Sequence, residues 1–282
     1  MSSTPSLTDY KVIMFDVYGT LVDWESGIVH GLKPILAGTP LASREAALTA
    51  YQNVERDLQT RYPTMRYSEL LTRVHAELDA RAHNLSAPAE PSGSTAATVE
   101  SSTGAVVEGT TVGSSASASE SPDAHTAFGQ SIGGWPPFPD TIAALTTLSK
   151  HFKLTVLSNV DRASFAHTQR ALEGPSDAPH FRFSAVYTAE DAGAYKPDPR
   201  AREYALRRVE AELGVPREQV LVVAVSVSHD VQPSREIGLA TAWISRKGSL
   251  IGWDGDEGSK ATFRFDTLGE MAEAVEHEAN GA

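Results

Sequence analysis

The sequence predicts an α/β fold in which a parallel sheet is wrapped by helices. Its second half alternates apolar strand-like runs with amphipathic helical segments, which is typical of a parallel sheet. A further apolar run near the N-terminus, KVIMF, ends in Asp16 and a tight turn at Gly19-Thr20. Helical segments that do not fit a sheet lie between these two regions. We therefore expect a sheet core with a helical, lid-like cap inserted after the first strand.

The individual elements follow from hydrophobic periodicity and turn residues. Besides the run before Asp16, the expected strands are Lys153–Ser158, Phe183–Tyr187, Val220–Val225, Ala240–Ile244 and Phe263–Phe265. In the cap, Ser43 is a plausible N-cap for a helix over residues 44–62, and a second helix covers Ser68–Ala82. The expected helices of the core are Thr141–His151, Asp161–Leu172, Arg200–Leu213, Val231–Gly238 and Leu268–Glu278.

A low-complexity segment interrupts the cap at about residues 86–127. It is rich in Ser, Ala, Thr, Gly, Pro and Glu, and it cannot bury enough surface to offset the entropy of ordering it. We expect a disordered loop, which is either a tolerated insertion or, less favoured, a phosphorylated or partner-binding segment. Residues 133–141, GGWPPFPDT, form a rigid hinge back to the core. The expected division is a core of residues 1–22 and 137–282 and a cap of residues 23–136.

The composition excludes several classes of function. A net charge of −12 repels nucleic acid phosphates and anionic membranes, so neither is an expected partner. The absence of cysteine excludes disulfides, a thiolate nucleophile and a cysteine-held zinc. No apolar run is long enough for a membrane span, and the N-terminus does not resemble a signal peptide. We expect a cytoplasmic protein with a small-molecule substrate, and a homodimer stays open.

Each of the first four expected strands ends in polar residues. These groups are Asp16, Ser158-Asn159, the Glu190–Lys196 loop and the Ser226–Asp230 turn. The carboxyl ends of parallel strands meet at one edge of a sheet, where α/β proteins place their ligands. The sequence therefore predicts an active site at this edge.

The same four segments resemble the motifs of the haloacid dehalogenase superfamily. They read DVYGT at Asp16, LSN at 157–159, YKPDP at 195–199 and SVSHD at 226–230, in the family's order. The DVYGTLVDW start is similar to the type II L-2-haloacid dehalogenase branch and its fungal relatives. The resemblance implies a Rossmann-like core, a helical cap after the first strand, and an Asp16 nucleophile that displaces halide through an aspartyl ester.

Roles for the remaining motif residues follow from this resemblance and from their chemistry. Thr20 can hydrogen-bond the Asp16 carboxylate, or it simply caps the turn. Lys196, held extended by the following proline, can bring an ammonium group to that carboxylate. Ser158 and Asn159 offer donors for a substrate carboxylate or phosphate, although both could instead cap the next helix.

Metal use separates the two main activities of the superfamily. Its phosphatases share two further acids. One is a second Asp two residues after the nucleophile, and the other is an acidic residue at the end of the fourth strand that holds Mg²⁺. Here these positions are Tyr18, which we assign to substrate binding, and Val225. We therefore expect no cofactor and no metal. The alternatives are a Mg²⁺-dependent phosphatase of a small metabolite and a catalytically repurposed scaffold.

Other positions depart from the dehalogenase pattern. The family's cap arginine, which takes the leaving halide, has four candidates here, and we favour Arg61 over Arg56, Arg66 and Arg73. The family's tyrosine six residues after the lysine is replaced by Arg202. Ser226 and His229 are candidate substrate contacts, His229 being either a proton-transfer group or a helix-start residue without a role. Asp230 would orient Lys196 or the hydrolytic water, and Trp24 would line the pocket or serve in packing alone.

Overall fold

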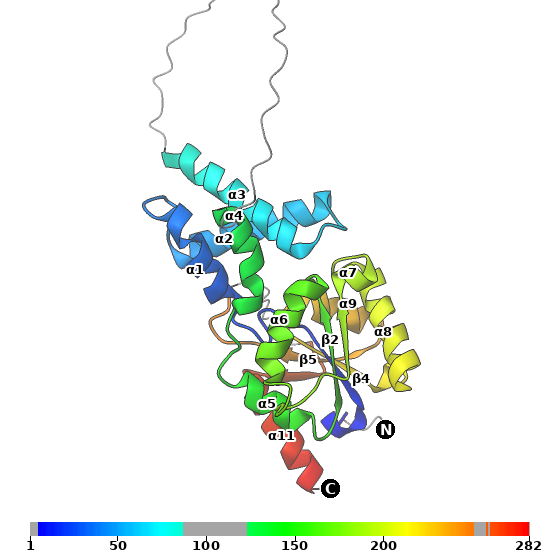
Figure 1. Ribbon diagram of the computed structural model, residues 1–282. Coiled ribbons are helices and arrows are strands. Elements are labelled where there is room, and N and C mark those ends of the chain that lie inside the picture. The colour runs from blue at the N-terminus through cyan, green and yellow to red at the C-terminus, as the bar shows by residue number, and fades with distance from the viewer. Residues whose placement is uncertain (1–4, 87–122, 251–257, 259, 282) are drawn as a thin grey trace, which may run out of the picture.

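The computed structural model describes residues 5–86, 123–250, 258 and 260–281. Six parallel strands form one sheet in the order β3-β2-β1-β4-β5-β6. The strands are β1 (Val12–Phe15), β2 (Lys153–Ser158), β3 (Ala185–Thr188), β4 (Val220–Ala224), β5 (Ala240–Ile244) and β6 (Phe263–Phe265). A helical cap stands beyond the carboxyl ends of the strands (Figure 1). This is the expected α/β architecture with a Rossmann-like parallel sheet.

The strand order fixes where the site must lie. From β1 the chain builds the sheet outward through β2 and β3, and it later returns to the other side of β1 to add β4, β5 and β6. The order therefore reverses between β1 and β4, the position where such sheets bind ligands. Phe15, the last residue of β1, pairs with Val156 of β2 and Val223 of β4. Asp16 thus emerges at the centre of the sheet edge.

Burial on both faces explains why β1 is a continuous apolar run. Ile13 and Phe15 belong to one buried cluster, and Val12 and Met14 belong to another on the opposite face. This alternation follows from the two-residue period of a strand. A polar side chain anywhere in this strand would be buried without water, so the first polar position is the one after its end.

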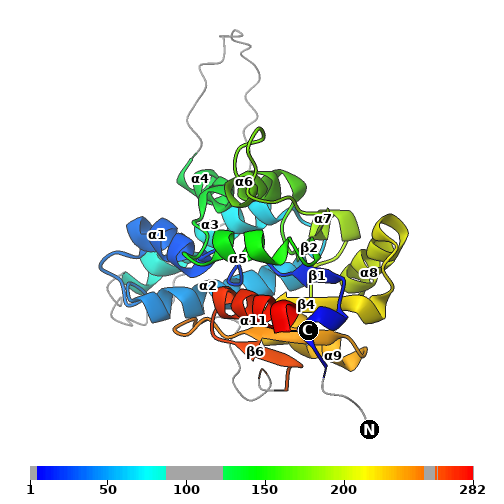
Figure 2. The same ribbon diagram turned by 90° about the horizontal axis from the view of Figure 1, so that it is seen from below.

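Helices cover both faces of the sheet. One cluster includes residues of α5 (Thr141–Leu148), α6 (Arg162–Glu173) and α11 (Leu268–Gly281), and α5 and α11 lie side by side (Figure 2). The other cluster is covered by α8 (Pro199–Leu213). The remaining short helices follow strand ends or lead into strands: α7 (Ala189–Ala192), η4 (Val227–Val231) and α9 (Gln232–Glu236), with η1 (Leu7–Asp9) and η3 (Arg217–Gln219). Among the described helices, none is both long and apolar enough to cross a membrane.

The described part of the cap contains four helices and a short 3-10 turn. They are α1 (Trp24–Leu36), α2 (Arg44–Arg61), α3 (Tyr67–Ser86) and α4 (Ala124–Gln130), followed by η2 (Ser131–Gly134). Ser43 caps α2 by accepting a hydrogen bond from the backbone of Ala46, as the sequence predicts. The two chain connections between cap and core lie side by side, because Val22 and Pro137 form a β-bridge.

The sequence pattern does not predict α1, because Gly27, Gly31 and Pro34 of this helix interrupt the helical pattern. Packing explains the two glycines. A Cβ at Gly27 would lie 2.5 Å from the Trp135 ring, and a Cβ at Gly31 would lie 2.5 Å from the Phe128 ring. The glycines therefore let two aromatic rings pack directly on the helix backbone, and this contact outweighs their poor helix propensity.

The structure also differs at the end of the expected loop. Residues 124–127 belong to α4, which Asp123 caps by accepting backbone hydrogen bonds from His125 and Thr126. Phe128 and Ile132 anchor this segment in the core cluster. The loop predicted from composition therefore ends too late in the sequence. A helix can pack with only one apolar residue per turn, and composition does not reveal that spacing. The rest of that prediction, residues 87–122, lies outside the described residues.

Gly31 offers a test of this packing. Gly31→Ala should lower the free energy of unfolding by about 1–3 kcal/mol, because the new methyl group must displace the Phe128 ring. Gly134→Ala is the matched control, because a Cβ there meets nothing within 4 Å. Urea denaturation of both variants measures the effect. Equal stability of the two variants would show that the ring does not need the glycine.

Candidate active site

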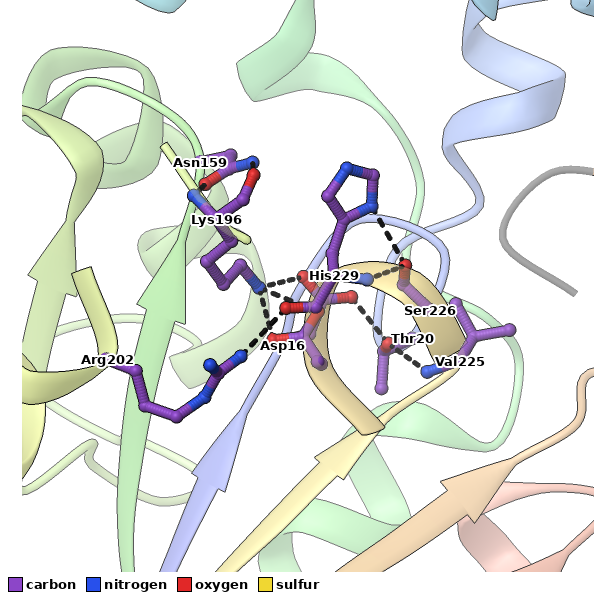
Figure 3. Close-up of polar contacts among 9 residues, drawn as sticks. Asp16, Thr20, Asn159, Lys196, Arg202, Val225, Ser226 and His229 are labelled. Carbon is purple, nitrogen blue, oxygen red and sulfur yellow. Dashed lines mark hydrogen bonds and ion pairs between the residues drawn. The ribbon is translucent and has the colours of Figure 1, made fainter. Parts of the chain in front are cut away.

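The site is built on the loop that follows β1. The Thr20 hydroxyl donates a hydrogen bond of 2.7 Å to Asp16 Oδ2 and accepts one of 2.9 Å from the backbone N–H of Val225 (Figure 3). Thr20 therefore ties the Asp16 carboxylate to the end of β4. The turn needs Gly19, whose φ is +91° and whose Cβ would lie 2.8 Å from Trp24 Nε1.

A buried lysine bridges two carboxylates at the centre of the site. Lys196 Nζ lies 2.9 Å from Asp16 Oδ1 and 2.8 and 3.1 Å from the two carboxylate oxygens of Asp230. Lys196 is only 2% exposed. Burial by itself would lower the pKa of Lys196, but the two carboxylates outweigh burial and raise it. The ammonium group therefore stays charged and holds Asp16 in place.

Asn159, at the end of β2, grips the backbone of Lys196. Its side-chain oxygen accepts a 2.6 Å hydrogen bond from the Lys196 N–H, and its amide donates a 3.0 Å bond to the Lys196 carbonyl. Both ends of the amide are thereby used to position the lysine. Ser158 differs, because its buried hydroxyl has no hydrogen-bond partner within the described chain.

The turn after β4 carries the remaining polar groups. Ser226 accepts a 3.3 Å hydrogen bond from the backbone of His229, and its hydroxyl lies 3.0 Å from His229 Nδ1. Burial lowers the pKa of His229 to about 4, helped by the positive charge of Lys196, so the imidazole is neutral at physiological pH. Burial raises the pKa of Asp230 in spite of Lys196, which lowers it. Arg202 donates a 2.8 Å hydrogen bond to the His229 carbonyl and so supports the turn from α8.

These groups open into a cavity of about 660 Å³ between core and cap. It is lined by most of the residues that the sequence analysis selected: Asp16, Tyr18, Trp24, Ser158, Asn159, Lys196, Ser226, His229 and Asp230. Tyr18 packs edge-to-face on Trp135, and its hydroxyl lies 2.8 Å from that of Thr168. Trp24 packs edge-to-face on Tyr51, while its buried Nε1 has no hydrogen-bond partner in the described part of the chain.

Arg61, the favoured cap arginine, does not line this cavity. It forms ion pairs with Asp57, at 2.6 Å, and Glu77, at 3.6 Å. Two of the other candidates are also engaged elsewhere: Arg66 with Glu190, and Arg73 over the ring of Tyr62. Arg56 is the candidate that lines the cavity, and its charge helps to lower the pKa of His229. Helical phase explains the difference, because five residues along α2 turn the two side chains to different faces.

Sequence reasoning missed two further contributors. Arg246 donates hydrogen bonds of 2.7 and 3.1 Å to the Thr20 carbonyl, pairs with Asp140 at 2.7 Å and stacks on Phe138. It thereby supports the Asp16–Thr20 loop from the end of β5. Glu55 of the cap lines the cavity. Neither residue belongs to a motif. Glu55 could have been found only by knowing which face of its helix is turned toward the edge of the sheet.

The donor set for a metal ion is thin. Mg²⁺ prefers six oxygen ligands in near-octahedral geometry. The side chain after β4 is the apolar Val225, and both nearby carboxylates, Asp16 and Asp230, are hydrogen-bonded to Lys196. Within the described residues, no three His, Asp or Glu side chains are grouped to hold a metal. These residues do not fit the magnesium site of the related phosphatases.

Comparison with known proteins agrees with the fold and the motifs. The haloacid dehalogenase-like hydrolase family matches residues 10–232, which is most of the chain, and the protein belongs to this family of hydrolases. Among curated proteins, none gives a significant match.

Solved structures show the same fold at low sequence identity. The L-2-haloacid dehalogenase of Xanthobacter autotrophicus is 18% identical with a TM-score of 0.64, over 95% of this chain and 98% of that one. A second structure of that enzyme contains covalently bound chloropropionic acid. The magnesium-bound HAD-hydrolase YfnB of Bacillus subtilis is 16% identical with a TM-score of 0.61, over 95% of this chain and 99% of that one. Such likenesses establish the shared fold.

The low pKa of His229 predicts a pH-dependent stability. The pKa of His229 is about 4 in the folded chain, below the ordinary histidine value of about 6.5. Between these two values the unfolded chain binds a proton at His229 and the folded chain does not. As the pH falls from about 7.5 to about 5.5, the free energy of unfolding should therefore decrease by about 1–2 kcal/mol more in the wild type than in His229→Gln. Urea unfolding across this range measures the difference. His30→Gln, at an exposed position on α1, should behave as the wild type, and a parallel decline of His229→Gln would contradict the assignment.

Proposed function

We propose that this protein is a metal-independent hydrolase of the 2-haloacid dehalogenase type, acting on a small 2-halogenated acid. The observation that carries the proposal is the Lys196 ammonium group bound between Asp16 and Asp230. It supplies positive charge beside the nucleophile, while Tyr18 and Val225 occupy the positions of the phosphatase acids. A halide leaves without a proton, so the first step needs no general acid.

In the first step Asp16 attacks C2 of the substrate. One carboxylate oxygen forms a C–O bond, the C–halogen bond breaks, and the halide leaves with the bonding electron pair. Lys196 and Thr20 fix the two oxygens of Asp16 and so limit its rotation. This positioning is the contribution that a weak carboxylate nucleophile needs most.

In the second step water attacks the carbonyl carbon of the Asp16 ester. The developing oxyanion is stabilised by the ammonium group of Lys196. Asp230 accepts the proton of the water, and its raised pKa makes it a better base than an ordinary carboxylate. The ester C–O bond then breaks, and the leaving alkoxide takes the second proton of the water from the new hydroxyl on the Asp16 carboxyl carbon. This frees a 2-hydroxy acid and restores the Asp16 carboxylate, while Asp230 releases the first proton to solvent.

The cavity offers donors for the carboxylate of such a substrate. Ser158 Oγ and Trp24 Nε1 are both buried, both belong to lining residues, and both lack a hydrogen-bond partner within the described chain. An unpartnered buried donor costs free energy until a ligand satisfies it. Both donors are covered in this structure, so we infer that each side chain shifts toward the cavity to donate to the carboxylate of a monoanionic haloacid. A phosphate dianion would meet the negative charge of Asp16 without a metal to offset it.

A two-by-two assay tests the proposal. The protein should release chloride from 2-chloropropionate equally well with excess EDTA and with Mg²⁺, because Lys196 supplies the compensating charge. It should not hydrolyse p-nitrophenyl phosphate under either condition. Phosphatase activity that EDTA abolishes and Mg²⁺ restores would overturn the proposal. The control is Asp16→Asn, which cannot form the ester and should reduce chloride release to background.

A comparison of Arg56 and Arg61 tests which cap arginine binds the leaving group. We propose that Arg56 binds the departing halide, because it is the cap arginine that lines the cavity. Arg56→Ala should lower kcat for 2-chloropropionate by about 10- to 100-fold, since it removes a positive charge near the developing anion. Arg61→Ala, on the same helix but paired with Asp57, should leave kcat nearly unchanged. The reverse result would return the role to Arg61.

A further inference from the structure

The cap places a carboxylate in the wall of the cavity. Glu55, on α2, is a lining residue, and its Oε1 accepts hydrogen bonds from the hydroxyls of Tyr67 and Tyr51 and from Gln59 Nε2. The two tyrosine hydroxyls lie 3.2 Å apart. Within the part of the chain that the structure describes, no hydrogen bond reaches Oε2. One oxygen of Glu55 is therefore fixed by the protein and the other is available to a ligand.

The charge of Glu55 is poorly compensated by the protein. Two of the three cations that line the cavity are paired with other acids: Lys196 with Asp16 and Asp230, and Arg200 with Asp198. The third, Arg56, is exposed. Burial raises the pKa of Glu55 to about 7, although the hydrogen bonds from the tyrosines and the charge of Arg56 lower it. Ionised Glu55 would therefore gain from a cation brought by the ligand.

The size of the cavity leaves room for such a group. Its volume of about 660 Å³ lies in the range that holds drug-sized ligands, well above the needs of a three-carbon haloacid. A substrate whose reacting carbon lies at Asp16, on the core side, can therefore extend to the cap. An apolar substrate tail would cover Glu55 Oε2 without giving it a hydrogen-bond partner, at a cost in free energy.

We propose that Glu55 is a specificity-determining residue, which binds a protonated amine at the end of the substrate remote from the reacting carbon. The substrate class is then an acid that carries a distal ammonium group. Tyr51 and Tyr67 donate to Oε1, which leaves Oε2 for the ligand. This inference about Glu55 depends on the proposed function in one respect only, namely that the reacting end of the substrate carries a halogen.

Binding of halogen-free analogues tests Glu55 without turnover. The probes are 6-aminohexanoate, 6-hydroxyhexanoate and hexanoate, each titrated calorimetrically into the whole wild-type chain at about pH 8, above the pKa of Glu55. The amine should bind at least about tenfold more tightly than hexanoate, because it forms a charge-assisted hydrogen bond with a partly desolvated carboxylate. Equal binding of the amine and hexanoate would overturn the proposal. Equal binding of the amine and the alcohol would overturn the choice of an ammonium group.

Two variants separate Glu55 from the general charge of the cap. Glu55→Gln keeps the shape and an acceptor for Tyr67, and it should abolish the preference for the amine. Asp57→Asn removes the same charge from the same helix, but at an exposed residue outside the cavity, and it should keep the preference. A preference that survives in Glu55→Gln, or that both variants lose equally, would refute the role of Glu55. If the amine preference holds while no haloacid is dechlorinated, the proposed function fails and this inference stands.

Discussion

The interaction between Lys196 and the carboxylates of Asp16 and Asp230 is the constraint on which the site depends. Three charged groups are buried together, which is tolerable only because each acid is hydrogen-bonded to the ammonium group. Removing Lys196 would leave the two carboxylates side by side without a counter-charge. The surrounding structure serves this arrangement: Asn159 fixes the lysine backbone, and Thr20 holds the free oxygen of Asp16.

The sheet topology brings these groups together from distant parts of the chain. Asp16 follows β1, Asn159 follows β2, and Lys196 lies between β3 and α8 (Figure 3). Asp230 lies in the turn after β4. The parallel register aligns the ends of these strands, so four loops meet at the point where the strand order reverses. The cap then covers this edge, and Lys196 and Asp230 are buried there, so little water can screen their charges.

The cap and the core contribute different chemistry to the cavity. In the proposed mechanism the core supplies the nucleophile, the ammonium group and the base. The cap supplies Arg56, Glu55 and the tyrosines that hold Glu55, and we propose that the charges of Arg56 and Glu55 select the substrate. The two parts also touch directly, since the backbone N–H of Ser68 donates to Asp161, the N-cap of α6.

The sequence by itself determined the α/β class, most of the core elements and the motif residues. These features are local: an apolar run that ends in Asp16, or a lysine before proline, carries its meaning within a few residues. Tertiary structure decided the rest. It selected Arg56 over Arg61 through helical phase, it made α1 a helix because Trp135 and Phe128 pack on its glycines, and it gave Asn159 the task of holding Lys196. Each of these depends on contacts between residues far apart in the chain, which local periodicity and composition do not encode.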